Sequence, residues 1–345
     1  MAPFTFNPLS WRLFSFISQR AGRVHVKDTL ASPSESIVSS PSTRSSVSSA
    51  SDTQNVLRDI ILDYLARIHV PFPQVTYDRD FEAACCNEIT RRGYILESLR
   101  PFLPGGVVMA TTSYSHLEDV SARIYIALYT GYLIYLDDVF EHDVTAVEVF
   151  NDRFVSHRKQ KDPVLDDFAD LLRRAPKLWP NKVVSNLIIT STLNLVTALL
   201  LENQTRDMRL RSVSCGYPTF SRVMSGASEA YGLFIFPANL PLPSFIQALP
   251  ELMVYINNGN DILSFYKEEA SGETVNRVSW LAQCHGYPKL DAVRELLEEA
   301  VMKREQILLI LKPSKEACNA FLRFTSGYIG FHAGLKRYRL GELDL

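Results

Sequence analysis

Long segments with helical hydrophobic spacing follow one another through most of this chain, and that succession constrains the fold more than any other feature. The alternation of apolar and polar residues that marks a half-buried β-strand is scarce, and proline or glycine marks most breaks. The expected helices cover residues 81–100, 116–140, 147–158, 166–175, 181–202, 217–234, 245–269, 275–284, 290–311 and 315–336. The pattern predicts an all-α fold, a single helical domain over residues 55–345.

Glycine and proline residues predict where individual helices end. Pro101, Pro104 and the Gly105–Gly106 pair are expected to stop the helix over residues 81–100. Near the start of the domain, apolar residues with helical spacing begin close to Asp52.

The first 54 residues have a different composition from the rest and are expected to be a disordered, Ser-rich N-terminal extension. Residues 1–27 contain no acid and carry four basic residues among Phe, Leu and Trp, as a mitochondrial transit peptide does. A dispensable extension explains the same composition, and we expect a cytoplasmic protein.

Charge and cysteine usage exclude several classes of partner. The net charge of −2 gives no electrostatic reason to expect a nucleic acid as partner. Five cysteines without paired metal-binding spacing fit free thiols in a reducing compartment. The most apolar stretch, residues 187–201, is interrupted by Thr, Ser and Asn and falls short of the ~18 residues that cross a bilayer. We therefore expect a buried core helix there and no stable membrane insertion.

The stretch YINNGNDILSFYKEE, residues 255–269, carries polar residues at helical spacing within an apolar helix. Asn260, Ser264 and Glu268 recur every four residues and so share one face. An amide, a hydroxyl and a carboxylate all offer oxygen, which Mg²⁺ prefers. Taken alone, the three residues also fit an ordinary helix with one solvated face.

A second stretch, YLIYLDDVFEHD over residues 132–143, ends an aromatic helix with a group of carboxylates. Asp137 and Glu141 are four residues apart and share a face, where like charges repel unless a cation bridges them. Asp138 adds a third carboxylate. Acids near a helix C-terminus also oppose the macrodipole, which makes a metal site at least as good an explanation as a solvated helix end.

Together the two stretches, DDxxE and NDxxSxxKE, resemble the two metal motifs of class I terpene cyclases. The segments GYPTFSRVM (216–224), SFYKE (264–268) and GYIGFHAGLKRYRL (327–340) extend the likeness. On these residues the chain resembles the trichodiene synthase family of fungal sesquiterpene cyclases over most of its length after about residue 90. The resemblance implies a class I terpene synthase bundle with a central active-site cavity.

The resemblance also implies roles for individual residues. It implies metal ligands in two groups: Asp137, Asp138 and Glu141, and Asn260, Ser264 and Glu268. It implies that the diphosphate group is contacted by Arg222, Lys267, Arg337 and Tyr338, of which Arg222, Arg337 and Tyr338 join Asp137 in catalysis. A cluster of about three Mg²⁺ ions, with Arg and Lys, would stabilise the charge of the leaving diphosphate.

Aromatic residues are the expected walls of the cavity, because a carbocation is quenched by water and stabilised by aromatic faces. For any single one of them simple core packing is the favoured explanation, and as a group they fit a hydrophobic pocket of farnesyl size. The candidates are Tyr94, Tyr125, Tyr129, Tyr132, Phe234, Trp280, Tyr328 and Phe331, with Tyr132 and Phe331 chosen as substrate contacts.

The leading hypothesis is a Mg²⁺-dependent sesquiterpene synthase that ionises and cyclises farnesyl diphosphate, with release of diphosphate and with homodimer formation left open. Two departures from the family pattern, Glu141 in place of an aspartate and Val223 in place of a second arginine, bear on the product rather than on ionisation. A chain-elongating prenyltransferase is an alternative, although it would carry a second aspartate-rich motif instead of the Asn–Ser–Glu triad. A non-catalytic isoprenoid-binding protein is another, although every liganding position holds a competent residue.

Overall fold

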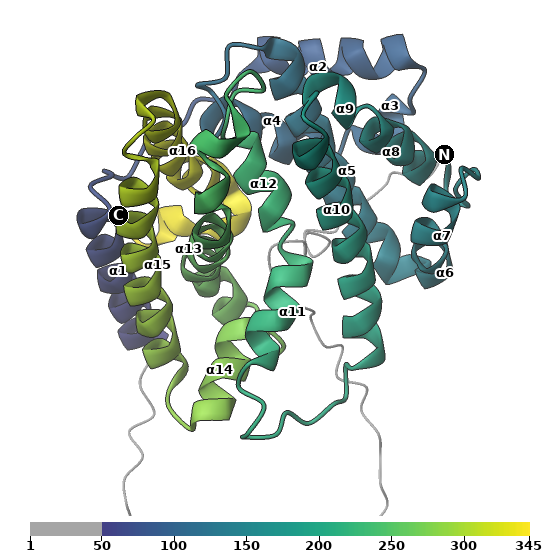
Figure 1. Cartoon of the computed structure of the whole chain (residues 1–345). Helices are drawn as coiled ribbons and strands as arrows, with labels where there is room; N and C mark the ends of the chain where they lie inside the picture. Colours follow the sequence, from purple (N-terminus) through teal and green to yellow (C-terminus); the bar gives the residue numbers. More distant parts are fainter. Residues whose placement is uncertain (1–49) are drawn as a thin grey trace, which may run out of the picture.

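The computed structural model describes residues 50–345, and it describes the side-chain environments of residues 53–140 and 143–345. Within that part of the chain all regular structure is helical and no strand is present, which confirms the predicted fold class (Figure 1). The serine-rich segment before residue 50 lies outside the described residues. The first helix begins at Ala50, before the domain boundary expected at residue 55.

The helices in chain order are α1 Ala50–Arg67, α2 Arg79–Arg92, α3 Leu96–Leu99, α4 Leu103–Thr112, α5 Val120–His142, α6 Val144–Glu148, α7 Phe150–Val155, α8 Pro163–Arg173, α9 Ala175–Leu178, α10 Lys182–Gln204, α11 Tyr217–Ser225, α12 Ser228–Phe234, α13 Leu249–Ala270, α14 Arg277–His285, α15 Lys289–Leu311 and α16 Lys315–Gly334. Short 3₁₀ helices are η1 Leu242–Ser244, η2 Ile246–Ala248, η3 Lys336–Tyr338 and η4 Leu340–Glu342.

Helix α13 occupies the interior of the bundle and carries most of the candidate site. It packs against α12 and α15 (Figure 1). The short helix η3, which follows α16 in the chain, also contacts it. Buried residues occur all round α13, from Leu252 to Phe265, and they include polar side chains. A polar side chain in such a position must find its partners inside the protein.

The long helix predicted over residues 181–202 is confirmed as α10, and local capping sets its start. Asn181 accepts hydrogen bonds from the backbone N–H groups of Val183 and Val184. Helix α10 is long and apolar enough to cross a membrane by length and composition, and half of its most apolar window is buried inside the protein. It packs against α11 and α12, as expected for a core helix.

The helix predicted over residues 81–100 is wrong in its extent. Helix α2 ends at Arg92 because Gly93 adopts the left-handed conformation, with φ of 75°, and its N–H bonds the carbonyls of Ile89 and Thr90. The short helix α3 follows separately.

The stop predicted at Pro104 and Gly105–Gly106 is also wrong, since these residues form the first turn of α4. A Cβ on Gly106 would lie 1.9 Å from the carbonyl oxygen of Ala127 on α5. At the other end of α4, a Cβ on Gly327 of α16 would lie 2.0 Å from the carbonyl oxygen of Thr112. These glycines let α4 pack backbone to backbone between α5 and α16.

The single helix predicted over residues 217–234 is divided in the structure. Helix α11 ends at Ser225, and Ala227 adopts a left-handed conformation with φ of 46° before α12 begins. The segment predicted as one helix over residues 147–158 is likewise divided into α6 and α7. Helix α11 lies beside α13 and α14.

Candidate active site

The oxygen-bearing face of α13 is buried, so the alternative of an ordinary helix with one solvated face does not apply. Asn260 is 1% exposed, Ser264 is fully buried and Glu268 is 3% exposed. Ser264 donates to Glu268, with 2.5 Å between Oγ and Oε1. Burial raises the pKa of Glu268, against the attraction of Lys267 and the hydrogen bond from Ser264. The face therefore presents three adjacent oxygen donors in a setting that disfavours an uncompensated anion.

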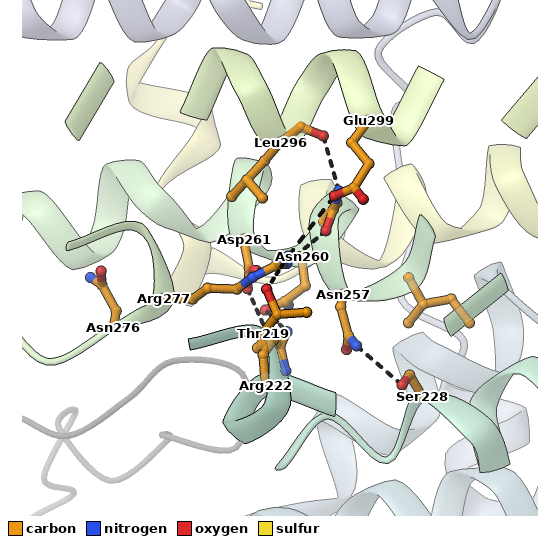
Figure 2. A network of polar contacts seen from close by, with 12 residues as sticks. Thr219, Arg222, Ser228, Asn257, Asn260, Asp261, Asn276, Arg277, Leu296 and Glu299 are labelled. Atoms are coloured by element: carbon orange, nitrogen blue, oxygen red, sulfur yellow. Dashed lines mark hydrogen bonds and ion pairs between the residues drawn. The ribbon is translucent and has the colours of Figure 1, made fainter. Parts of the chain in front are cut away.

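Arg222 reaches this face from α11. Its Nε donates to Oδ1 of Asp261 at 2.7 Å, and its Nη2 donates to Oδ1 of Asn260 at 3.0 Å (Figure 2). Burial lowers the pKa of Arg222, but the attraction of Asp261, its hydrogen bond and the smaller effects of Tyr328 and Glu268 together outweigh burial and leave that pKa raised. Arg222 is thus a permanently charged fork bonded to a predicted metal ligand.

A second buried arginine, on α14, completes this network, and the sequence reasoning missed it. Nη1 of Arg277 donates to Oδ2 of Asp261 at 3.0 Å and to Oδ1 of Asn258 at 2.6 Å (Figure 2). Asp261 therefore lies between two arginines, each less than 10% exposed. Asp261 could have been found, because it follows Asn260 in the motif. Arg277 has no local sequence signal.

Lys267, Arg337 and Tyr338 lie together near the C-terminal end of α13. Burial lowers the pKa of Lys267, repulsion by Arg337 lowers it further, and the attraction of Glu268, Glu273 and Asp137 opposes both. The Arg337 guanidinium lies 5.2 Å from the centre of the Tyr338 ring. Tyr338 is fully buried, and burial raises its pKa to about 12. These three predicted diphosphate contacts are brought together by η3 packing on α13.

Of the three acids predicted at the end of α5, the structure brings Asp137 toward this cluster. Asp137 is 5% exposed and its charge acts on Lys267. Asp138 is half-buried on the same helix, and its charge contributes to the raised pKa of Tyr135, after burial and Asp162. The side chain of Glu141 lies outside the described residues. Asp137 and the α13 face therefore approach the basic residues from different helices.

His332 of α16 is a buried imidazole in contact with the same face. Its Nε2 lies 3.2 Å from Nδ2 of Asn260, and its Nδ1 lies 2.8 Å from the carbonyl oxygen of Tyr328. Sequence reasoning did not single it out, although it lies within a segment used for the family resemblance.

The predicted aromatic walls separate into two groups. Phe331 lies beside Tyr338, with ring centres 5.8 Å apart, and so belongs to the site. Tyr132 instead stacks on Phe168 at 5.4 Å and meets Tyr94 edge-on at 6.2 Å. Tyr132 and Asp137 point about 140° apart around α5. The role of Tyr132 as a substrate contact stays a prediction that this packing does not favour.

The remaining aromatic candidates lie in three places: among other core rings, beside Phe331, and near the surface of the bundle. Phe234 packs with Tyr125 at 6.1 Å and with Tyr129 at 5.3 Å between centres. Tyr328 stacks near Phe331 at 6.5 Å, whereas Trp280 contacts Tyr217 at 5.8 Å.

The donor set fits a hard divalent cation. The α13 face supplies an amide oxygen, a hydroxyl and a carboxylate, which are Mg²⁺ ligands by chemistry. Among the residues whose side chains are described, no three His, Cys, Asp or Glu side chains form one metal-sized group. A cation at this face would therefore take further oxygens from water or from a bound phosphate group.

The chain is similar in sequence to several terpene synthases. The family model described as trichodiene synthase matches residues 105–344. The alpha-cuprenene synthase COP6 of Coprinopsis cinerea is 36% identical over 292 residues, which cover 83% of this chain and 90% of that protein. Monoterpene synthase 25 of Postia placenta is 33% identical over 299 residues, which cover 84% of this chain and 88% of that protein. Longiborneol synthase CLM1 of Gibberella zeae is 31% identical over 237 residues, covering 66% and 69%.

A solved structure shares the fold. The linalool/nerolidol synthase of Streptomyces clavuligerus superposes with a TM-score of 0.56, covering 79% of this chain and 98% of that chain. The sequence identity is 14%, so this likeness speaks for the fold alone.

Proposed function

The chain belongs to the trichodiene synthase family of terpene synthases, and from that membership we propose that it is a Mg²⁺-dependent sesquiterpene synthase acting on farnesyl diphosphate. The observation that carries the proposal is the meeting of Arg222 with the α13 face that bears Asn260, Ser264 and Glu268. A cationic fork beside buried oxygen donors suits a group that is both anionic and metal-binding, as a diphosphate is.

The basic residues of the site account for the binding of the leaving group. A diphosphate carries about three negative charges, and Arg222 offers a planar fork for its oxygens. Lys267 and Arg337 repel each other, and this repulsion contributes to the lowered pKa of Lys267. A polyanion between them would relieve that repulsion. When bound, Mg²⁺ would act as a Lewis acid that stabilises the departing diphosphate oxygens.

Asn260, Ser264 and Glu268 would hold one part of the metal cluster, and Asp137 would hold another from α5. Ionisation breaks the bond between C1 of the isoprenoid and the diphosphate oxygen, and both electrons leave with the oxygen. The aromatic ring of Phe331, next to Tyr338, offers a face toward which developing positive charge is attracted. The same apolar surroundings exclude the water that would quench the cation.

A shorter substrate is the second candidate, because one relative is named a monoterpene synthase. Geranyl diphosphate carries the same diphosphate group, so the residues around Arg222 do not discriminate between the two chain lengths. The length of the isoprenoid is decided by the walls beyond the diphosphate.

The test is incubation of the purified protein with geranyl, farnesyl or geranylgeranyl diphosphate, with and without Mg²⁺, followed by gas chromatography of the extracted hydrocarbons. We expect cyclic products from farnesyl diphosphate and none after chelation of the metal. Parallel reactions with added isopentenyl diphosphate test chain elongation, which would give longer diphosphates instead. Faster turnover of geranyl diphosphate would favour the second candidate, and Arg222→Gln is the matched inactive variant.

A further inference from the structure

The side chains of His332 and Asn260 are in contact. Whether this contact is a hydrogen bond depends on which end of the Asn260 amide, the oxygen or the NH₂ group, faces the imidazole. The two residues are 72 positions apart, on α16 and α13, and both are buried. Asn260 has a second partner on its other side, since its Oδ1 accepts from Nη2 of Arg222 at 3.0 Å. The amide is thus held between an imidazole and a guanidinium.

The hydrogen-bond pattern defines the tautomer of His332. Its Nδ1 lies 2.8 Å from the carbonyl oxygen of Tyr328, which can only accept, so Nδ1 carries the hydrogen. Nε2 of the neutral ring is then an acceptor, and it faces the NH₂ end of Asn260 at 3.2 Å. Burial lowers the pKa of His332 to about 3, which agrees with a neutral ring.

Aromatic neighbours keep the ring in this position. Tyr328 meets it edge-on at 4.7 Å between centres, Phe331 lies at 5.1 Å and Tyr338 at 4.5 Å. The imidazole therefore has little freedom to turn, and its acceptor nitrogen stays directed at Asn260.

We propose that His332 is a positioning residue that keeps the Oδ1 atom of Asn260, and not its NH₂ group, turned toward the bound metal. The inference rests on the proposed function, in which Asn260 is a Mg²⁺ ligand. The amide nitrogen carries hydrogens and cannot coordinate a hard cation, so a flipped amide would lose one ligand. Arg222 favours the same orientation, but the proposed function turns its fork toward diphosphate during the reaction. His332 holds the amide when Arg222 is engaged elsewhere.

The test is a double-mutant cycle that removes either the imidazole or the need for orientation. His332→Phe keeps an aromatic ring but removes the acceptor. Asn260→Asp places oxygen at both ends of the side chain, so no orientation is required. Binding is measured with Mn²⁺ by electron paramagnetic resonance in the presence of inorganic diphosphate, which is independent of turnover.

We expect His332→Phe to weaken Mn²⁺ binding about 10- to 100-fold in the parent chain, as loss of a partner to a metal ligand commonly does. In the Asn260→Asp background the same change should cost little, because the neutral Nε2 acceptor would repel a carboxylate. His332→Gln should restore most of the affinity, since an amide oxygen can accept from Asn260. In turnover assays we expect His332→Phe to need a higher Mg²⁺ concentration and to keep a nearly unchanged kcat at saturating Mg²⁺.

The control is His116→Phe. His116 also bonds a backbone carbonyl, that of Ile235 at 2.8 Å, but it precedes the N-terminal end of α5, whereas Asp137 lies near the C-terminal end. It should lose stability without losing Mn²⁺ affinity.

Several results would overturn the inference. If His332→Phe weakens Mn²⁺ binding equally in the parent chain and in the Asn260→Asp chain, the role of His332 is merely structural. If a folded His332→Phe protein binds Mn²⁺ as the parent does, His332 has no role in metal binding. If His332→Phe does not fold, His332→Gln takes its place. A Mn²⁺ affinity of His332→Gln as low as that of Asn260→Ala would then contradict the inference. A parent protein that binds no Mn²⁺ with diphosphate would overturn the proposed function as well.

Discussion

Ser264 donates its hydroxyl hydrogen to Glu268 one turn further along α13, so two of the predicted metal ligands are hydrogen-bonded to each other. The bond holds the carboxylate against the helix and places both oxygens on the face that Asn260 shares. We expect Ser264→Ala to raise the Mg²⁺ concentration needed for half-maximal turnover at least about 10-fold, because a ligand and the partner of a second ligand are lost together. Ser264→Thr keeps the hydroxyl and is the control. Identical Mg²⁺ titrations of the alanine variant and the parent would contradict the assignment.

Arg277 is expected to be a major stabilising residue of the site region. Arg277→Met would leave Oδ2 of Asp261 and Oδ1 of Asn258 without their shared donor in a buried setting. Removal of one partner from a buried ion pair costs about 3 kcal/mol or more of unfolding free energy. Urea unfolding measures the change.

The matched control for that experiment is Arg294→Met. Arg294 pairs with Asp291 at 2.7 Å, but both side chains are about half exposed, so the loss should stay below about 1 kcal/mol. Equal losses in the two variants would mean that the buried network contributes no more than a surface pair.

The contact between α4 and α5 gives a third prediction. In Gly106→Ala the new Cβ would lie 1.9 Å from a backbone oxygen of α5, so one of the two helices must move. We expect the free energy of unfolding to fall by about 3 kcal/mol or more, which is at the high end for overpacked cores. Gly131→Ala on α5 meets its nearest atom at 3.7 Å, and should be neutral or stabilising by up to about 1 kcal/mol. Thermal melting of both variants tests the pair, and comparable melting temperatures would show that α4 tolerates displacement.

Asp167 gives a prediction on pH. Burial raises its pKa to about 6, against the hydrogen bond from the N–H of Ile95, and the neighbouring aspartates add to the rise. The folded state therefore holds a proton more tightly than the unfolded state, so this group's contribution to stability falls as pH rises from about 4 through 6. Asp167→Asn keeps an acceptor for Ile95 and removes the charge. It should stabilise the protein by about 1 kcal/mol at pH 7.5, discounted for solvent screening, and the gain should shrink toward pH 4.

Urea unfolding at the two pH values checks this, with Asp59→Asn as the control. The Asp59 side chain is 75% exposed, and its variant should differ from the parent by less than about 0.5 kcal/mol at either pH. A pH-independent effect of Asp167→Asn would show that the carboxyl keeps an ordinary pKa in the folded state.

Features that depend on neighbours in the chain were predictable from the sequence by itself. The all-α fold follows from helical spacing, and Asn260, Ser264 and Glu268 share a face because a helix returns to the same side about every four residues. The resemblance to a family gave Lys267 its role and added Arg222 and Arg337, which no spacing connects to that face.

Features that depend on distant partners were decided by the tertiary structure. Gly93 ends a helix through its own left-handed conformation, whereas Gly106 lies inside a helix that packs closely against α5. A Cβ added to Gly93 would meet no other part of the protein within 4 Å, whereas Gly106 touches α5. Arg277 and His332 acquire their partners only when α14 and α16 pack against α13. A buried polar group is satisfied by whichever donor or acceptor the fold brings to it, and local sequence carries no record of that choice.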